Sequence, residues 1–187
     1  MLFSPVFARE VKALESNFSD KKKRFDSSLI LGAAKKCKFN HVQVITCSPI
    51  AKKLRPFPTS FWLTCPYLIK LAGKIESQCG IMKLEKFLLD NNLFHEWNQY
   101  NLLHQLIRVN LLDKKLQEFL RKYKSSLYKS LMRGGVGGTK YFFSEINIKC
   151  LHLQTASFLA LNYHPAGEWL KSQGLQSECN NCQCSRL

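Results

Sequence analysis

A long segment from Leu84 to Leu131 has the apolar spacing of α-helices. Its apolar residues recur at steps of three or four positions, the period at which side chains return to one helix face. They form two runs, which are Leu93, Trp97, Tyr100, Leu103, Ile107 and Leu111, followed by Leu116, Leu120, Tyr123, Leu127 and Leu131. The phase slips between the runs, close to Asn110 and Asp113. The segment therefore predicts two helices or one kinked helix.

Shorter helices are expected outside this segment. One runs from Tyr67 to Glu76, and another runs from Cys150 to Leu161, after which Pro165 and Gly167 end it. A further short helix is predicted near the start of the chain, from Phe3 to Asn17.

The region before the helix at Tyr67 has the composition of short strands. His41 to Cys47 (HVQVITC) is rich in β-branched residues, and Ser60 to Thr64 (SFWLT) is a second candidate. Prolines at positions 49, 56 and 58 exclude regular helix between them and predict an extended connection. We therefore expect a mainly helical α+β fold. A few short strands near residues 41–64 pack with helices from 67–131 and 150–161.

The length and composition fit one globular domain with extensions. The chain has 187 residues, of which 45% are apolar, enough to bury a core. We expect a helical, basic extension over residues 1–35, a single domain over 36–170 and a cysteine-containing tail over 171–187. No run approaches the ~20 apolar residues of a membrane span, and no basic leader precedes an apolar core at the start. The chain is therefore expected to be soluble and cytoplasmic.

Positive charge is gathered in two blocks of the chain, whose formal net charge is +15. The block from Lys21 to Arg55 has Asp26 as its single acid, and the block from Lys114 to Lys140 has Glu118. Such blocks predict contact with the phosphates of a nucleic acid or another polyanion. The candidate contacts are Lys21, Lys22, Lys23, Arg24, Lys114, Lys115, Arg121 and Lys122. No known nucleic-acid-binding motif accompanies them, so solvated helix faces are the alternative.

A glycine-rich segment, RGGVGGT from Arg133 to Thr139, must form a loop. Backbone N–H groups of Gly134, Gly135, Gly137 and Gly138 are candidates for binding an anion. The segment lacks the GK[ST] end of a phosphate-binding P-loop and the GxGxxG spacing of a dinucleotide site. A flexible connection is therefore the competing interpretation.

The eight cysteines are expected to be reduced thiols in a cytosolic chain, either buried, catalytic or bound to metal. Cys47 and Cys79 have the apolar setting of core residues. Cys179, Cys182 and Cys184 form a CxxCxC tail, which is compact enough to hold an iron–sulfur cluster. Cys65, directly before Pro66, is also a candidate nucleophile with His152 or His164 as its base.

Several motifs together resemble a bacterial family classified as domain of unknown function 501. They are PFPTSFWLTCPYL (Pro56 to Leu68), Ile75-Glu76 with Gly80, KCLH (Lys149 to His152), HPAG (His164 to Gly167) and KCKFNHVQVI (Lys36 to Ile45). The family pattern has PFPTxxWLTCP, KCLHAH, NPxG and RCxxGxPxVI at these places. The chain therefore departs from it at Asn40, Val42, Gln154 and His164. The resemblance covers about residues 36–167 and implies a bacterial cytoplasmic setting, but no activity.

The family pattern carries over to Cys37, Cys65, Cys150 and His152. Three thiolates and one imidazole are the donor set of a closed, structural zinc site. We therefore expect these residues to bind zinc, or less readily an iron–sulfur cluster, in a binding or adaptor module that meets a protein partner. A basic nucleic-acid or polyanion-binding protein is the alternative, and a thiol-dependent enzyme or iron–sulfur protein is the second alternative. Whether the chain is an enzyme stays open.

Overall fold

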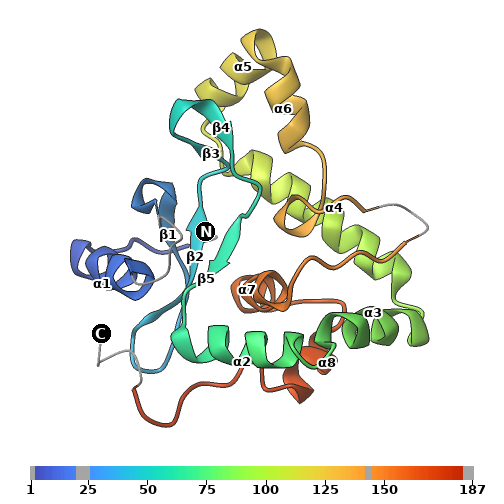
Figure 1. Ribbon diagram of the computed structural model, residues 1–187. Helices are drawn as coiled ribbons and strands as arrows, with labels where there is room; N and C mark the ends of the chain where they lie inside the picture. The colour runs from blue at the N-terminus through green and yellow to red at the C-terminus, as the bar shows by residue number, and fades with distance from the viewer. Residues whose placement is uncertain (1–2, 20–25, 142–144, 183–187) are drawn as a thin grey trace.

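A three-stranded antiparallel sheet, in the order β1-β2-β5, lies between α1 and α7 (Figure 1). The computed structural model describes residues 3–19, 26–141 and 145–182. Within these ranges α1 spans Ala8–Ser19, β1 Ile30–Lys36, β2 Val42–Cys47 and β5 Phe61–Leu63. Helices make up 54% of the structure and strands 13%, which confirms the mainly helical α+β fold.

All six residues of the central strand β2 are buried, so the strand is covered on both faces. Val44 packs with Leu63, Leu68 and Ala156 on the α7 side, while Ile45 packs with Leu14 of α1 on the other side. β-Branched side chains suit such a position, because they fill the pleated surface with little rotamer freedom to lose. The strand predicted over 41–47 is therefore confirmed, as is the second strand within 60–64.

The sequence patterns did not reveal β1, because its residues ILGAAKK lack the alternation of a half-buried strand. Residues 30–35 of the expected N-terminal extension lie in this strand, which pairs along β2. Ser4 and Ala33 exchange two backbone hydrogen bonds at the outer edge of β1. The sheet thus begins before residue 36.

Helices build the rest of the core. They are α2 (Pro66–Glu76), α3 (Gly80–Asp90), α4 (Phe94–Asn110), α7 (Leu151–Leu161) and α8 (Gly167–Ser172). Their buried side chains include Leu84, Trp97, Tyr100, Leu151 and Leu170. The helices predicted over 67–76 and 150–161 are confirmed as α2 and α7.

The break predicted near Asn110 and Asp113 is also confirmed. Helix α4 ends at Asn110, and α5 (Lys114–Tyr123) begins after Asp113, whose carboxylate accepts a hydrogen bond from Leu116 N. Such a side-chain cap satisfies an N–H group that has no partner inside the helix. A further break at Lys124 separates α5 from α6 (Ser125–Leu131). The long predicted segment therefore contains more than two helices.

Helices α5 and α6 project from the core beside a small hairpin (Figure 1). The hairpin consists of β3 (Ile50–Ala51), a short turn over Lys52–Leu54 and β4 (Arg55–Pro56). Leu112, Leu120 and Leu131 form a separate apolar cluster against Ile50. We call residues 50–56 and 114–131 the basic lobe. Among the described residues, no helix has both the length and the apolar character that crossing a membrane requires.

Candidate metal centre

Glu76, Cys150 and His152 come together where the end of α2 meets the start of α7. One ligand atom from each of the three side chains lies within 4.8 Å of the others. Glu76 is the last residue of α2, Cys150 is the residue that precedes α7, and His152 lies in the first turn of α7. The site is half-buried, which leaves a route for an ion to enter.

Local sequence accounts for the start of α2, and packing brings its other end to α7. Pro66 is the first residue of α2, where its missing N–H costs nothing and its fixed φ favours the helix. The eleven-residue helix α2 ends at Glu76. The packing of α2 on α7 then brings Glu76 to the N-terminus of α7, where Leu151 N donates to Glu76 Oε1. Helix N-termini favour negative charge, so this contact fixes the carboxylate.

The His152 ring lies between a carboxylate and a carbonyl group. Its Nε2 is 3.2 Å from Ile69 O, and its Nδ1 is 3.1 Å from Glu76 Oε1. A carbonyl oxygen and a carboxylate both only accept hydrogen bonds, so each ring nitrogen faces an acceptor. An ion bound at Nδ1 would leave the ring proton on Nε2, where it is donated to Ile69 O. His152 Nδ1 is therefore the nitrogen that faces the Glu76 carboxylate and is placed to bind an ion.

The Cys150 thiol is held in its protonated form by its surroundings. Burial raises the pKa of Cys150, and the Glu76 carboxylate raises it too, while the backbone N–H groups of Leu153 and His152 and the charge of Lys149 lower it. A thiolate binds metals far more strongly than a thiol. A divalent cation in this place would exchange for the thiol proton and balance the charge of the carboxylate.

The structure divides the predicted ligand set. Cys150 and His152 lie together with Glu76, whereas Cys37 and Cys65 are outside this cluster. Cys65 precedes α2 at the opposite end from Glu76. Burial raises the pKa of the Cys65 thiol, and the nearby thiols of Cys179 and Cys37 raise it further. This environment disfavours the thiolate that a cysteine nucleophile needs.

The remaining cysteines have different surroundings. Cys47 is fully buried, as expected of a core residue, but Cys79 is exposed, so the core assignment of Cys79 was wrong. Cys79 precedes α3 in a left-handed backbone conformation, with φ of 60°. The tail residue Cys179 is buried, and Cys182 lies beside His41. Cys184 falls outside the described residues.

The glycine loop turns its carbonyl groups toward a buried arginine. The Arg108 guanidinium, 1% exposed, donates to the carbonyl oxygens of Pro58, Leu131, Arg133, Gly134 and Gly135. Burial lowers the pKa of Arg108 to about 10, so its charge persists at neutral pH.

The N–H groups of the same loop are engaged within the protein. Val136 N donates to Asn101 Oδ1, while Gly135 N and Gly138 N bind carbonyl oxygens of the loop itself. Gly134 and Gly135 thus hold Arg108 through their carbonyl groups, and Gly138 N bonds to the Gly135 carbonyl within the loop. No contact between Arg108 and Gly137 is among those of the described residues. The anion site expected on these glycines stays a prediction.

Two further histidines are buried. His164, a candidate base, contacts Gln154 rather than a cysteine. Burial lowers the pKa of His164 to about 3, with His104 contributing. Burial also lowers the pKa of His104 to about 3, together with the charge of Arg108. Both rings are therefore neutral at physiological pH and belong to the core.

The predicted polyanion contacts fall into two groups. Lys114, Lys115, Arg121 and Lys122 are exposed on α5. Lys21, Lys22, Lys23 and Arg24 lie outside the described residues.

The sequence patterns missed two residues with central positions, Glu76 and Arg108. Glu76 stands in one of the blocks that resemble the family, but a lone carboxylate at a helix end carries no recognisable signal. Arg108 lies inside a helical run, where its sequence context is the same as that of an ordinary surface cation.

Comparison with known proteins places the chain in a family. The chain matches neither a curated protein nor a solved structure. The family match covers residues 33–172, so it includes most of the sheet, the Glu76, Cys150 and His152 cluster and the glycine loop, while residues 173–187 follow it. The chain belongs to the family described as protein of unknown function (DUF501).

Proposed function

We propose that this chain is a metal-binding domain in which Glu76, Cys150 and His152 hold a divalent ion, with zinc as the first choice. The observation that carries the proposal is the convergence of a carboxylate, a thiol and an imidazole within 4.8 Å from two packed helices. Each is an ordinary zinc ligand, and their mixture suits zinc better than magnesium or calcium, which prefer oxygen ligands alone.

The distance between two of the ligand atoms is close to that in a zinc site. Zinc binds imidazole nitrogen and carboxylate oxygen at about 2.0–2.2 Å, so two such ligands lie about 3.4 Å apart in a tetrahedron. His152 Nδ1 and Glu76 Oε1 are 3.1 Å apart, and small side-chain shifts admit the ion. The carboxylate and the Cys150 thiolate together match the charge of Zn²⁺, so the half-buried site would be neutral.

Neighbouring backbone groups support the same assignment. A metal-bound histidine usually donates its other ring N–H to a carbonyl or carboxylate, which fixes the tautomer and the ring orientation. Ile69 O lies in this position for His152, and Leu151 N fixes Glu76 Oε1. The ligands are thus oriented from outside by α2 and α7.

The ion would join α2 to α7 and leave one coordination position open. Three protein ligands are one fewer than a closed tetrahedral site requires. A water molecule or a side chain of a protein partner can fill the fourth position. This arrangement fits a binding or adaptor module in which the metal both fastens the two helices and offers a contact.

Metal analysis of matched variants tests the proposal. The wild-type chain, Glu76→Gln, Cys150→Ser and the control Cys79→Ser are loaded with excess zinc, dialysed and measured for zinc per chain. We expect Glu76→Gln and Cys150→Ser to hold about one equivalent less than the wild type. Cys79→Ser should match the wild type, because Cys79 is exposed before α3. Equal zinc contents in the wild type and both site variants would overturn the proposal.

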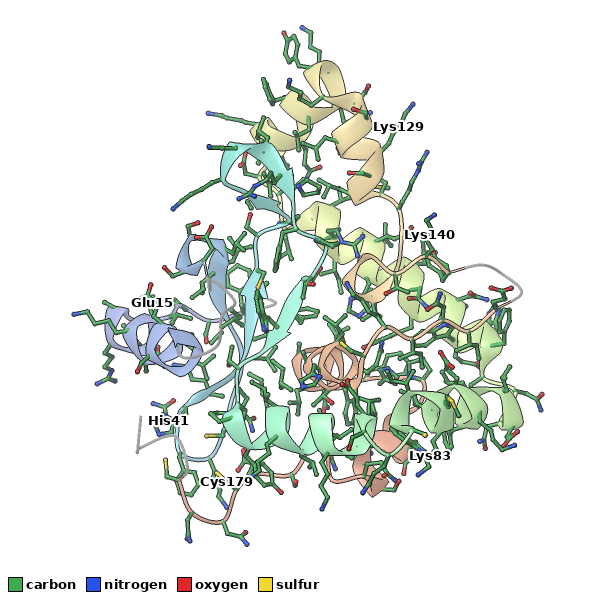
Figure 2. The ribbon with its side chains drawn as sticks, in the orientation of Figure 1. Glu15, His41, Lys83, Lys129, Lys140 and Cys179 are labelled. Carbon is green, nitrogen blue, oxygen red and sulfur yellow. The ribbon has the colours of Figure 1, made fainter. Side chains whose placement is uncertain are left out.

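Polyanion binding by the basic lobe is the second candidate function. Its exposed cations lie on the β3–β4 hairpin, on both helices and between them, and they are Lys52, Lys53, Arg55, Lys114, Lys115, Arg121, Lys122, Lys124 and Lys129. Figure 2 labels Lys129 on α6, beside side chains that extend into solvent. Phe119 and Tyr123 are exposed on the same helix, α5, and their rings are available to stack on bases.

A salt titration with a short single-stranded RNA tests this second function. We expect the affinity of the wild-type chain to fall steeply as salt rises, because binding releases counterions. Neutralising Lys115, Arg121 and Lys122 to Gln should weaken binding more than the matched changes of Lys70, Lys74 and Lys83, which are exposed outside the lobe. Equal losses from the two triple variants would show that only net charge matters.

A further inference from the structure

The C-terminal tail returns to the hairpin that joins β1 to β2. We call residues 173–182 the tail and residues 37–41 the hairpin turn. Glu178 Oε1 accepts a hydrogen bond of 2.9 Å from Lys38 N, and Cys182 Sγ lies 3.1 Å from His41 Nε2. Figure 2 labels His41 and Cys179 at this end of the molecule. Two segments that are 141 residues apart in sequence therefore meet through a thiol and an imidazole.

The hairpin turn places Cys37 and His41 opposite each other. Cys37 N donates to His41 O at 2.9 Å, and Asn40 N donates to Cys37 O at 2.8 Å. Asn40 has φ of 62°, a left-handed conformation that asparagine tolerates better than most residues. Side chains of such a directly opposed pair lie on the same face of the ladder. The turn thus carries one thiol and one imidazole at positions whose backbones are hydrogen-bonded.

The tail supplies two more thiols. Cys179 is 6% exposed, and Cys182 follows three residues later. The Cys179 and Cys37 thiols are close enough to Cys65 to raise its pKa. Cys179 and Cys37, from the tail and the turn, therefore lie beside the same buried cysteine.

The two segments together have the spacing of a zinc-binding chain. The tail has a CxxC pair, and the turn has Cys and His with three residues between them. Structural zinc sites take two short pairs of this kind from separate segments, and they close with four protein ligands. We propose that Cys37, His41, Cys179 and Cys182 bind a second zinc ion, which fastens the tail to the β1–β2 hairpin.

One pair of the four ligands already has the spacing of a zinc site. A thiolate at about 2.3 Å and an imidazole nitrogen at about 2.0 Å from one tetrahedral zinc lie about 3.5 Å apart. Cys182 Sγ and His41 Nε2 are 3.1 Å apart, so this pair already has nearly that spacing. No three of the four tail and turn ligands lie within 4.8 Å of one another, unlike the Glu76 cluster. Side-chain rotations of Cys37 and Cys179 must complete the site.

The second site has a different role from the first. Three thiolates and one neutral imidazole would leave a zinc site with one negative charge. Four protein ligands leave no position for an external ligand. The ion therefore has a structural role, the attachment of a tail that lies beyond the family match over residues 33–172.

Zinc analysis of the full-length chain tests this second site separately from the first. We expect about two zinc ions per wild-type chain and about one in the double variant Cys179→Ser/Cys182→Ser, with Cys79→Ser as the matched control. The Cys150→Ser variant should lose the other equivalent. The proposal is overturned if the double variant keeps the full zinc content of the wild type, whatever the result for Cys150→Ser.

A measurement on the unaltered chain guards against misfolding of the double variant. Thiols that bind zinc react slowly with an alkylating reagent, and a chelator restores their reactivity. Mass spectrometry should show that zinc protects Cys37, Cys179 and Cys182 but leaves Cys79 reactive. Equal reactivity of the three thiols with and without zinc would overturn the proposal. A disulfide between any two of them in the freshly purified chain would overturn it as well.

Discussion

The Nε2 atom of His164 lies 3.0 Å from Oε1 of Gln154, inside the core. Ala166 N donates to His164 Nδ1, so the ring proton must be on Nε2 and points to Gln154. These are two of the positions at which the chain departs from the family pattern, which has histidine in place of Gln154 and asparagine in place of His164. The two departures are in contact in this structure.

We expect the two positions to be energetically coupled. Gln154→His alone would set two imidazoles against each other, and His164→Asn alone would leave a gap beside the Gln154 amide. Each single change should lower the free energy of unfolding by about 1–3 kcal/mol, the usual cost of a buried polar group that loses its partner. The double change should cost less than the sum of the two. Urea denaturation measures this, and strict additivity would contradict the coupling.

Stability should fall as the pH falls below about 6.5. His104 and His164 have folded-state pKa values lowered to about 3 by burial, so they stay neutral in the folded chain while the unfolded chain binds protons. Each histidine then removes up to about 1.4 kcal/mol of stability per pH unit. Denaturation with a chelator present, at pH 7, 6 and 5, measures the slope.

The exposed His95 provides the control for this pH dependence. His95→Gln should leave the slope unchanged, whereas His164→Asn should make it shallower because one buried imidazole is removed. The same slope in His164→Asn and in the wild type would mean that protonation of His164 does not limit stability at these pH values.

Arg108→Lys should destabilise the fold strongly despite keeping the charge. The guanidinium donates hydrogen bonds to five carbonyl oxygens, and an ammonium group with three donors cannot reach all of them. We expect a loss of about 3–5 kcal/mol, as when a buried charge loses its partners. Arg121→Lys on exposed α5 should change stability by less than about 0.5 kcal/mol. Similar effects of the two changes would show that the loop carbonyls do not depend on Arg108.

Two glycines should respond in opposite directions to alanine. A Cβ at Gly135 would overlap the side-chain amide of Asn101, which accepts the Val136 N–H. Gly135→Ala should therefore cost about 1–3 kcal/mol through overpacking. Gly73 lies inside α2 with open space within 4 Å of the point that a Cβ would occupy, so Gly73→Ala should gain about 0.5–1 kcal/mol. Thermal denaturation compares the stabilities of the two variants. A Gly135→Ala chain as stable as the wild type would mean that the loop shifts to admit the Cβ at little cost.

Local features of the sequence could be predicted because their causes are local. The end of α4 and the start of α5 depend on the phase slip and on the cap at Asp113, both of which lie within a few residues. The start of α2 depends on Pro66 in the same way. Strand β1 escaped detection because its pairing with β2, and not its own composition, makes it a strand.

The candidate site was only partly predictable. Cys150 and His152 could be selected because thiol and imidazole stand two residues apart in a motif. Their partner Glu76 is a single carboxylate, and its contact with Leu151 N spans 75 residues. The tail cysteines stood out by their spacing, but their position beside the hairpin turn did not.

The sequence by itself determined α2, α7 and the break between α4 and α5, the two strands of β-branched and aromatic residues, and the family, because periodicity, caps and motifs are properties of short segments. Only the tertiary structure decided which side chains meet. The packing of α2 against α7 brings Glu76 to Cys150 and His152, and the return of the tail brings Cys182 to His41. Such contacts arise from apolar burial between distant segments, and no local pattern in the chain records them.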